Sequence, residues 1–202
     1  MAVAVAYFDI SRAEDTIKVL DESKGCQDSG LTPHNGSQIR NENTCVSLEI
    51  GELPDFNHMV SCVITRPFNE QQIKKNTNFT VKIAISNLAT GFFSDPAVDY
   101  YQIQQTLDNG GVIQGHSHIT IQKLKVVNRN VLIPDPRVFA FFKGLNDAAV
   151  KGVLSVVVTN GLPVAGTYRI CVMNSSNSHQ PVVMPVAQRG AQDDCIRINV
   201  VD

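Results

Sequence analysis

Hydrophobic and polar residues alternate along much of the chain after residue 59. The clearest example is the run 79–86, in which Phe79, Val81, Ile83 and Ile85 would share one face of a strand. Comparable runs predict further strands at 59–65, 112–124, 153–159, 167–173 and 195–201. The connections between these runs contain Gly, Pro, Asn and Asp, and helical periodicity is scarce. This pattern favours an all-β fold, an immunoglobulin-like antiparallel β-sandwich with one or two short helices in its connections.

One of these helices is predicted between the third and fourth strands. Asp135 is a good N-cap residue, Pro136 suits the first helical position, and Lys143 followed by Gly144 is typical of a helix end. A helix over 135–144 would bury Val138, Phe139 and Phe142 on one side.

Residues 1–55 differ from the rest of the chain. Ser11 and Glu14 form a capping-box pattern that predicts a short helix over 12–20. Residues 25–43 are polar and rich in turn formers, which indicates a long loop, and 45–50 has the composition of a strand. We therefore expect an irregular N-terminal segment, 1–55, packed on a β-sandwich domain, 56–202.

Composition excludes some partners. The chain has 202 residues, 43% of them hydrophobic, and a formal net charge of −2. Nucleic-acid binding requires a basic face, and the sequence contains no dense Lys/Arg run, so no nucleic-acid partner is expected. No stretch reaches the ~18 consecutive apolar residues of a membrane helix, so no membrane span is expected either. The pattern does not specify an oligomeric state.

Some sequence features favour secretion and others favour a cytosolic location. None of the five cysteines forms a C-x-x-C pair, which argues against zinc-finger and thioredoxin-like sites. Glycosylation sequons at Asn35, Asn78 and Asn174 suggest a secreted glycoprotein. Residues 1–7 lack the basic region and full apolar core of a signal peptide, so we expect a mature form if the protein is secreted. These features alone leave secreted and cytosolic locations open.

Histidines supply the main candidate for chemistry. His116 and His118 are two residues apart in a predicted strand, so both imidazoles would lie on the face opposite Ile119 and Ile121. Two imidazoles on one strand face can bind one divalent transition metal. The polar stripe on that face continues through Gln114, Thr120 and Gln122.

A third metal ligand would have to come from elsewhere in the chain. His179, which follows a polar loop, is the best candidate, and Asp193 or Asp194 could bind the metal or orient an imidazole. The alternative interpretation is a polar sheet face whose histidines only form hydrogen bonds with neighbouring strands and loops.

Other catalytic sites have little support in the sequence. There is no G-x-S-x-G motif, and Ser117 would point away from the two histidines that flank it. No pair of carboxylates suggests a glycosidase. The aromatic pairs Phe92–Phe93 and Tyr100–Tyr101 could form a sugar-binding platform, or they could hold a long connection against the core.

Four stretches resemble a family of secreted fungal proteins of unknown function, some of whose members carry the name of a ribosomal protein. The stretches are 78–91, 112–119, 135–146, and 165–171 with its continuation through 177–181 to 193–195. The resemblance covers about residues 76–200 and implies a signal peptide in the precursor, secretion or a cell-wall location, and an all-β fold. It implies no reaction.

The resemblance also bears on the disulfides. It places paired cysteines at Cys171 and Cys195, which lie in late strands that should be neighbours, and the loop from Cys26 to Cys45 is loosely similar. We therefore predict bridges Cys171–Cys195 and Cys26–Cys45, with Cys62 buried and free as a small hydrophobic side chain.

Tyr168 is predicted to be structural. It follows the turn 161–167 at the start of a strand, so its ring should pack inside while its hydroxyl forms a hydrogen bond with a backbone group.

Two classes of function remain, and the sequence does not decide whether the protein is an enzyme. The first is a secreted, extracellular or wall-associated protein without catalytic motif, which binds cell-wall polysaccharide or a host surface or has a structural role. The second is a metal-dependent enzyme or metal-binding protein with a divalent transition metal held by His116, His118 and His179.

Overall fold

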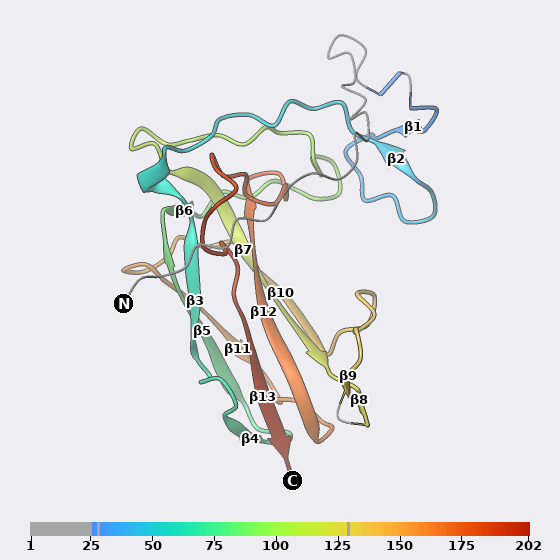
Figure 1. Cartoon of the computed structure of the whole chain (residues 1–202), viewed down its shortest axis with the longest axis vertical. Helices are drawn as coiled ribbons and strands as arrows, with labels where there is room; N and C mark the ends of the chain where they lie inside the picture. The colour runs from blue at the N-terminus through green and yellow to red at the C-terminus, as the bar shows by residue number, and fades with distance from the viewer. Residues whose placement is uncertain (1–25, 28, 129) are drawn as a thin grey trace, which may run out of the picture.

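Two β-sheets face each other in the computed structural model, which describes residues 26, 27, 29–128 and 130–202. The larger sheet has six strands and the smaller has three (Figure 1). The order in the larger sheet is β10 (Phe141–Leu145), β7 (Ile113–Lys123), β12 (Gly166–Ser176), β13 (Cys195–Val201) and β4 (Gln72–Lys74), with β6 (Leu88–Thr90) also paired to β7. The order in the smaller sheet is β11 (Val153–Val158), β5 (Phe79–Ser86) and β3 (Ser61–Arg66). The predicted immunoglobulin-like β-sandwich is confirmed.

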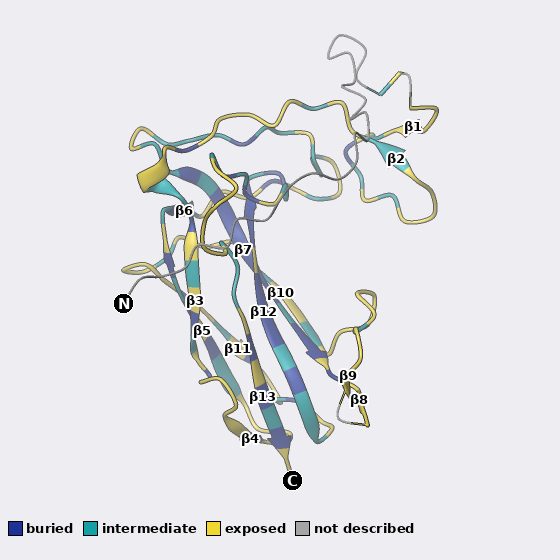
Figure 2. Ribbon diagram, in the orientation of Figure 1, coloured by how far each residue is buried: buried dark blue, intermediate teal, exposed yellow. Residues whose placement is uncertain are grey.

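The core lies between the two sheets (Figure 2). Val81 and Ile83 of β5 are fully buried, as are Ile119 and Ile121 of β7 on the opposite sheet. Strict alternation in β5 explains this, because every second side chain of a strand points to the same face. The strands predicted at 59–65, 79–86, 112–124, 153–159, 167–173 and 195–201 are all present, with bounds that differ by up to three residues.

The strand β7 is buried on both faces. Its odd-numbered residues face the smaller sheet, and its even-numbered residues face the connections that cover the outer side. The partner strand β12 is antiparallel to it, with His116 opposite Ser175 and His118 opposite Met173. Long connections therefore cover the outer face of the larger sheet at β7 and bury the side chains on that face.

The segment before the sandwich contains little regular structure. In the described part of residues 26–55, β1 (Thr32–Pro33) pairs with β2 (Thr44–Cys45), so the strand expected at 45–50 is reduced to its first residue. A single 3₁₀ turn, η1 (Phe56–His58), follows. The helix predicted at 12–20 lies outside the described residues. The boundary at residue 55 stays a prediction.

The helix predicted at 135–144 is wrong. The Asp135 carboxylate accepts hydrogen bonds from the amide and guanidinium of Arg137, which closes a turn, and the chain then enters β10. Phe142 lies in β10, where it pairs with Thr120 of β7 and remains 48% exposed. Val138 and Phe139 are exposed too. Pairing with the open edge of β7 satisfies the backbone and overrides the local helix signals. A small hairpin of β8 (Val126–Val127) and β9 (Asn130–Val131) precedes this segment.

The predicted disulfides Cys26–Cys45 and Cys171–Cys195 are both present, and Cys62 is free. The Cys62 thiol is only half-buried, and this burial raises its pKa to about 11. Cys171 and Cys195 are opposite each other in the β12–β13 ladder, as the prediction of neighbouring strands requires.

Two further residues of β12, Tyr168 and Asn174, are almost completely buried. Tyr168 is 2% exposed and its hydroxyl donates to the Val164 carbonyl at 2.7 Å, which confirms the structural role. Asn174 is 2% exposed, and its side-chain amide donates a hydrogen bond to the Gln192 carbonyl. This burial leaves no room for a glycan at the Asn174 sequon. Asn35 and Asn78 are exposed. Among the described residues, no helix is long and apolar enough to cross a membrane.

Candidate metal centre

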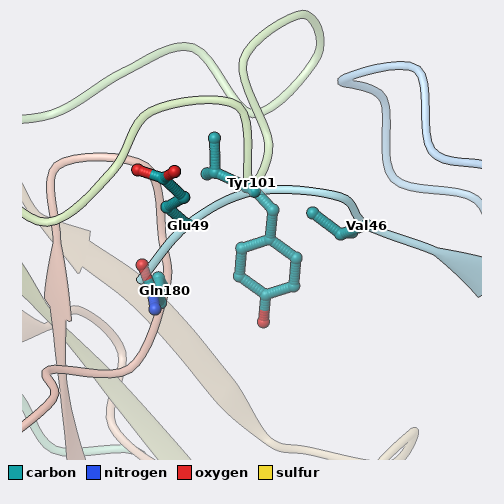
Figure 3. Close-up of a pocket in the computed structure, with 5 residues that line it drawn as sticks. Val46, Glu49, Tyr101 and Gln180 are labelled. Carbon is teal, nitrogen blue, oxygen red and sulfur yellow. The ribbon is translucent and has the colours of Figure 1, made fainter. Parts of the chain in front are cut away.

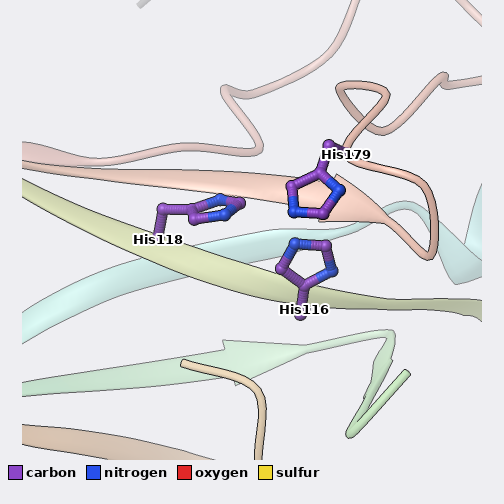
Figure 4. A group of neighbouring side chains, drawn as sticks. All are labelled: His116, His118 and His179. Carbon is purple, nitrogen blue, oxygen red and sulfur yellow. The ribbon is translucent and has the colours of Figure 1, made fainter. Parts of the chain in front are cut away.

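Three histidines meet on the outer face of the larger sheet (Figure 4). His116 and His118 project from β7, and His179 reaches them from the turn that follows β12. One nitrogen from each ring lies within 4.8 Å of the other two. The ring centroid of His116 is 4.7 Å from those of both His118 and His179. The structure thus brings together all three residues that the sequence nominated as a metal cluster.

Hydrogen bonding fixes the orientation of His116. Its ring is fully buried, and Nδ1 lies 3.1 Å from the carbonyl oxygen of Phe92. A carbonyl only accepts, so Nδ1 carries the proton and Nε2 presents its lone pair. No group in the described part of the chain bonds to Nε2 of His116, and Nδ1 of His179 is also buried and unpartnered. A backbone carbonyl that orients an imidazole in this way is common behind metal ligands.

Burial keeps these imidazoles neutral. Loss of hydration, followed by the two neighbouring imidazoles, lowers the pKa of His116 to about 3. The same causes, burial first and then His179, lower the pKa of His118 to about 4. Burial also lowers the pKa of His179. Neutral imidazole is the form that binds metal, so all three rings are in the competent state at neutral pH.

The backbone at His179 is in a sparsely populated conformation. His179 has φ of 70°, and Tyr101, on the neighbouring connection, has φ of 57°. The two segments are joined by a hydrogen bond from the Tyr101 amide to the Ser178 carbonyl and another from the Ser94 amide to the Asn177 carbonyl. Histidine adopts positive φ more readily than most residues, whereas a tyrosine seldom does, and such outliers concentrate at functional sites.

Aromatic rings surround the three histidines. Phe93 contacts His116 and His179 edge to face, with ring centroids 5.2 Å apart in both pairs. Phe142 stacks on His118, and Tyr100 lies beside His179. The connection that carries the pairs Phe92–Phe93 and Tyr100–Tyr101 is therefore held against the histidines. The sequence suggests for both pairs only a sugar platform or a means of holding that connection against the core.

One side of the cluster opens into a hollow of about 420 Å³. His118 and His179 line it together with Tyr100, Tyr101 and Phe142, while Asp193 contributes the acidic group. A metal held by the three imidazoles would have His118 and His179 on the side of this hollow. A ligand could then approach the metal from the hollow.

The acidic pair plays a different part from the one considered in the sequence. The Asp193 carboxylate lines the hollow but accepts a hydrogen bond from the backbone amide of Asn174. The Asp194 carboxylate accepts one from the backbone amide of Ile64. Neither belongs to the group of close ligand atoms. Ser117 points to the opposite face, as expected, and donates to the Asn174 side chain at 2.5 Å.

The polar stripe along β7 is used to hold connections in place. Gln122 donates to the carbonyls of Asp135 and Val138 and accepts from Arg169, while Gln114 accepts from Thr106. These residues support the interpretation of a hydrogen-bonded sheet face, as does the contact between His116 Nδ1 and the Phe92 carbonyl.

Comparison with known proteins identifies the family. The model of the CLU5d N-terminal domain matches residues 62–201. The chain belongs to this family. "Pathogenicity cluster 5 protein d" of the fungus Colletotrichum graminicola is 43% identical over 178 residues, which are 87% of this chain and 36% of that protein. The chain thus spans about a third of the length of this relative. The family is fungal, in agreement with the resemblance seen in the sequence.

Among solved structures, the chain is similar to the CARDB domain of a Pyrococcus furiosus protein in complex with di-metal ions. The TM-score is 0.32 at 12% identity, over 74% of this chain and 94% of that one. A likeness of this size says nothing about function.

Proposed function

We propose that the domain is an extracellular metal-binding module in which His116, His118 and His179 hold one divalent transition metal, zinc or copper. Imidazole nitrogen is a good ligand for both ions. Three protein ligands leave at least one coordination position for water or for a ligand oxygen. A metal bound in this way would supply a Lewis-acidic centre next to the hollow.

The single observation that carries this proposal is the unpartnered Nε2 of His116. This nitrogen is buried without a hydrogen-bond partner in the described part of the chain, and it faces the ring of His179 (Figure 4). Burial of an unsatisfied polar group costs about 1–3 kcal/mol. A purely structural cluster would leave this cost uncompensated, whereas a metal ion accepts the lone pair of this atom. The alternative of a hydrogen-bonded sheet face accounts for Gln122 but not for this nitrogen.

An extracellular location is supported by independent features. The two disulfides suit an oxidising environment, because such bridges are rare in the cytosol. The relative from a fungal pathogenicity cluster is consistent with a protein that acts outside the cell. Under this proposal, Asn35 and Asn78 are the exposed sequons open to glycosylation.

Metal content of the purified protein tests the proposal. We expect the wild type to bind one zinc or copper ion per chain at pH 7, measured by mass spectrometry of the metal and by calorimetric titration of the metal-free protein. His116→Ala should abolish this binding. His179→Asn should do so as well, with less risk to folding, because Asn tolerates the positive φ at that position.

His58→Ala is the matched control. His58 lies in η1 and its Nδ1 is 2.9 Å from the Asp55 carboxylate, outside the cluster. This variant should bind metal like the wild type. The proposal fails if the folded wild type takes up no zinc and no copper at neutral pH, or if His179→Asn binds as tightly as the wild type.

A further inference from the structure

The hollow beside the histidines has two neighbours. A second hollow, of about 310 Å³, is lined by Tyr100 and Tyr101 together with His34, Arg40 and Val46. A third, of about 270 Å³, is lined by Tyr101 with Val46, Glu49 and Gln180 (Figure 3). Tyr101 lines all three hollows. This one residue is therefore shared by the linings of all three hollows.

The tyrosine pair forms a compact aromatic surface. The ring centroids of Tyr100 and Tyr101 are 4.2 Å apart, and both side chains are partly exposed. The hydrogen bond from the Tyr101 amide to Ser178 fixes the pair to the turn that carries His179. The aromatic surface is thus held in a set position relative to the metal ligands, at the expense of an unfavourable φ at Tyr101.

Polar groups around the rings carry no dominant charge. Arg40 is basic, Glu49 and Asp193 are acidic, and Gln38 and Gln180 are neutral amides. The side-chain oxygen of Gln180 is buried without a hydrogen-bond partner among the described residues, which leaves one acceptor in this lining unsatisfied. Aromatic faces with scattered donors and acceptors suit a ligand that has apolar ring faces and many hydroxyl groups.

We propose that these three hollows form a binding site for a neutral oligosaccharide chain. One sugar unit lies on Tyr101, and the next enters the hollow lined by His118 and His179. There its hydroxyl oxygen would be able to bind a metal held by the three histidines, so this inference rests on the proposed metal site. An extended ligand is favoured over a single small molecule because separate hollows share Tyr101 in their lining.

Binding of four hexasaccharides to the zinc-loaded chain of 202 residues tests this inference. The probes are the hexaoses of β-1,3-glucan, cellulose, chitin and mannan, measured by isothermal titration calorimetry. We expect at least one to bind, and we expect Tyr101→Asn to weaken that binding at least fivefold, since stacking on the ring is lost while Asn tolerates φ of 57°. Phe68→Ala removes another exposed aromatic ring, outside the hollows, and should leave binding unchanged.

Zinc titration of the same samples separates the two proposals. Tyr101→Asn should bind zinc like the wild type, because Tyr101 supplies no metal ligand. Removal of zinc should weaken saccharide binding at least threefold if a hydroxyl contacts the metal. The saccharide inference is overturned if none of the four probes binds to the zinc-loaded protein, or if Tyr101→Asn binds them unchanged. In either case intact zinc binding leaves the metal site standing.

Discussion

The imidazole of His116 is fully buried, and its burial makes stability depend on pH. In the unfolded chain this histidine takes up a proton near pH 6.5, whereas in the fold its pKa is about 3. Between these values the unfolded state binds a proton that the folded state does not. The stability that the neutral ring provides is therefore complete above pH 6.5 and is lost as pH falls toward 3.

A urea-unfolding series on metal-free protein measures this effect. One unit of pKa corresponds to about 1.4 kcal/mol, so between pH 7 and pH 4.5 the wild type should lose about 2 kcal/mol more than His116→Asn does. The comparison with the variant removes the contribution of carboxylates common to both proteins. An equal loss in the two proteins would contradict a buried, neutral His116.

Tyr168 is the largest fully buried side chain of the core. Tyr168→Ala should lower the free energy of unfolding by about 3 kcal/mol, because it removes a packed ring and leaves a cavity. Tyr168→Phe removes only the hydrogen bond to the Val164 carbonyl and should cost about 1 kcal/mol. Urea unfolding measures both values. If Tyr168→Ala unfolded at the same urea concentration as the wild type, the packing of β12 described above would be wrong.

At the scale of elements, the antiparallel pair β12–β13 is fastened by Cys171–Cys195. The bridge closes a loop over a sequence separation of 24 residues, and chain entropy predicts a loss of about 3 to 4 kcal/mol when both cysteines become alanine. Removal of Cys26–Cys45 should cost the sandwich less, because β1 and β2 pair only with each other. Non-reducing peptide mapping checks the pairing, and a link from Cys62 to another cysteine would contradict it.

The sequence predicts the six long strands of the sandwich correctly, but it fails at the segment 135–144. Alternation in 79–86 and 112–124 gave the strands, their faces and the position of His116 and His118 opposite Ile119, because strand geometry is a local property. The helix predicted at 135–144 is wrong because the outcome there depends on a long-range contact. The residues suit the start and end of a helix, but the segment instead forms a ladder of hydrogen bonds with the edge of β7, which local sequence does not predict.

The third histidine could be nominated from the sequence but not placed. Its approach depends on a turn with positive φ at His179 and on hydrogen bonds to a connection some 75 residues earlier, such as that between Ser178 and Ile103. The roles of Tyr100 and Tyr101 in the hollows depend on the same long-range contacts. Periodicity carries no information about such contacts.

In the whole molecule, the candidate site lies at the end of the sandwich where the long connections gather (Figure 1). The strands β7 and β12, of 11 residues each, provide a rigid surface, and the connections add Phe93, Tyr101 and His179. Sites built from loops on a fixed scaffold are common in proteins, since the scaffold tolerates changes in the loops. A bound metal would join the turn after β12 to the sheet itself.

X-ray absorption spectroscopy of the zinc-loaded protein tests the central claim most directly, because it reports the ligands of the metal rather than its presence. We predict three imidazole nitrogens at about 2.0–2.1 Å, with one oxygen ligand from water. His179→Asn loaded with excess zinc should lose this signature, and His58→Ala should keep it. A spectrum of the wild type with no more than one imidazole, or with sulfur as a ligand, would contradict a metal held by His116, His118 and His179.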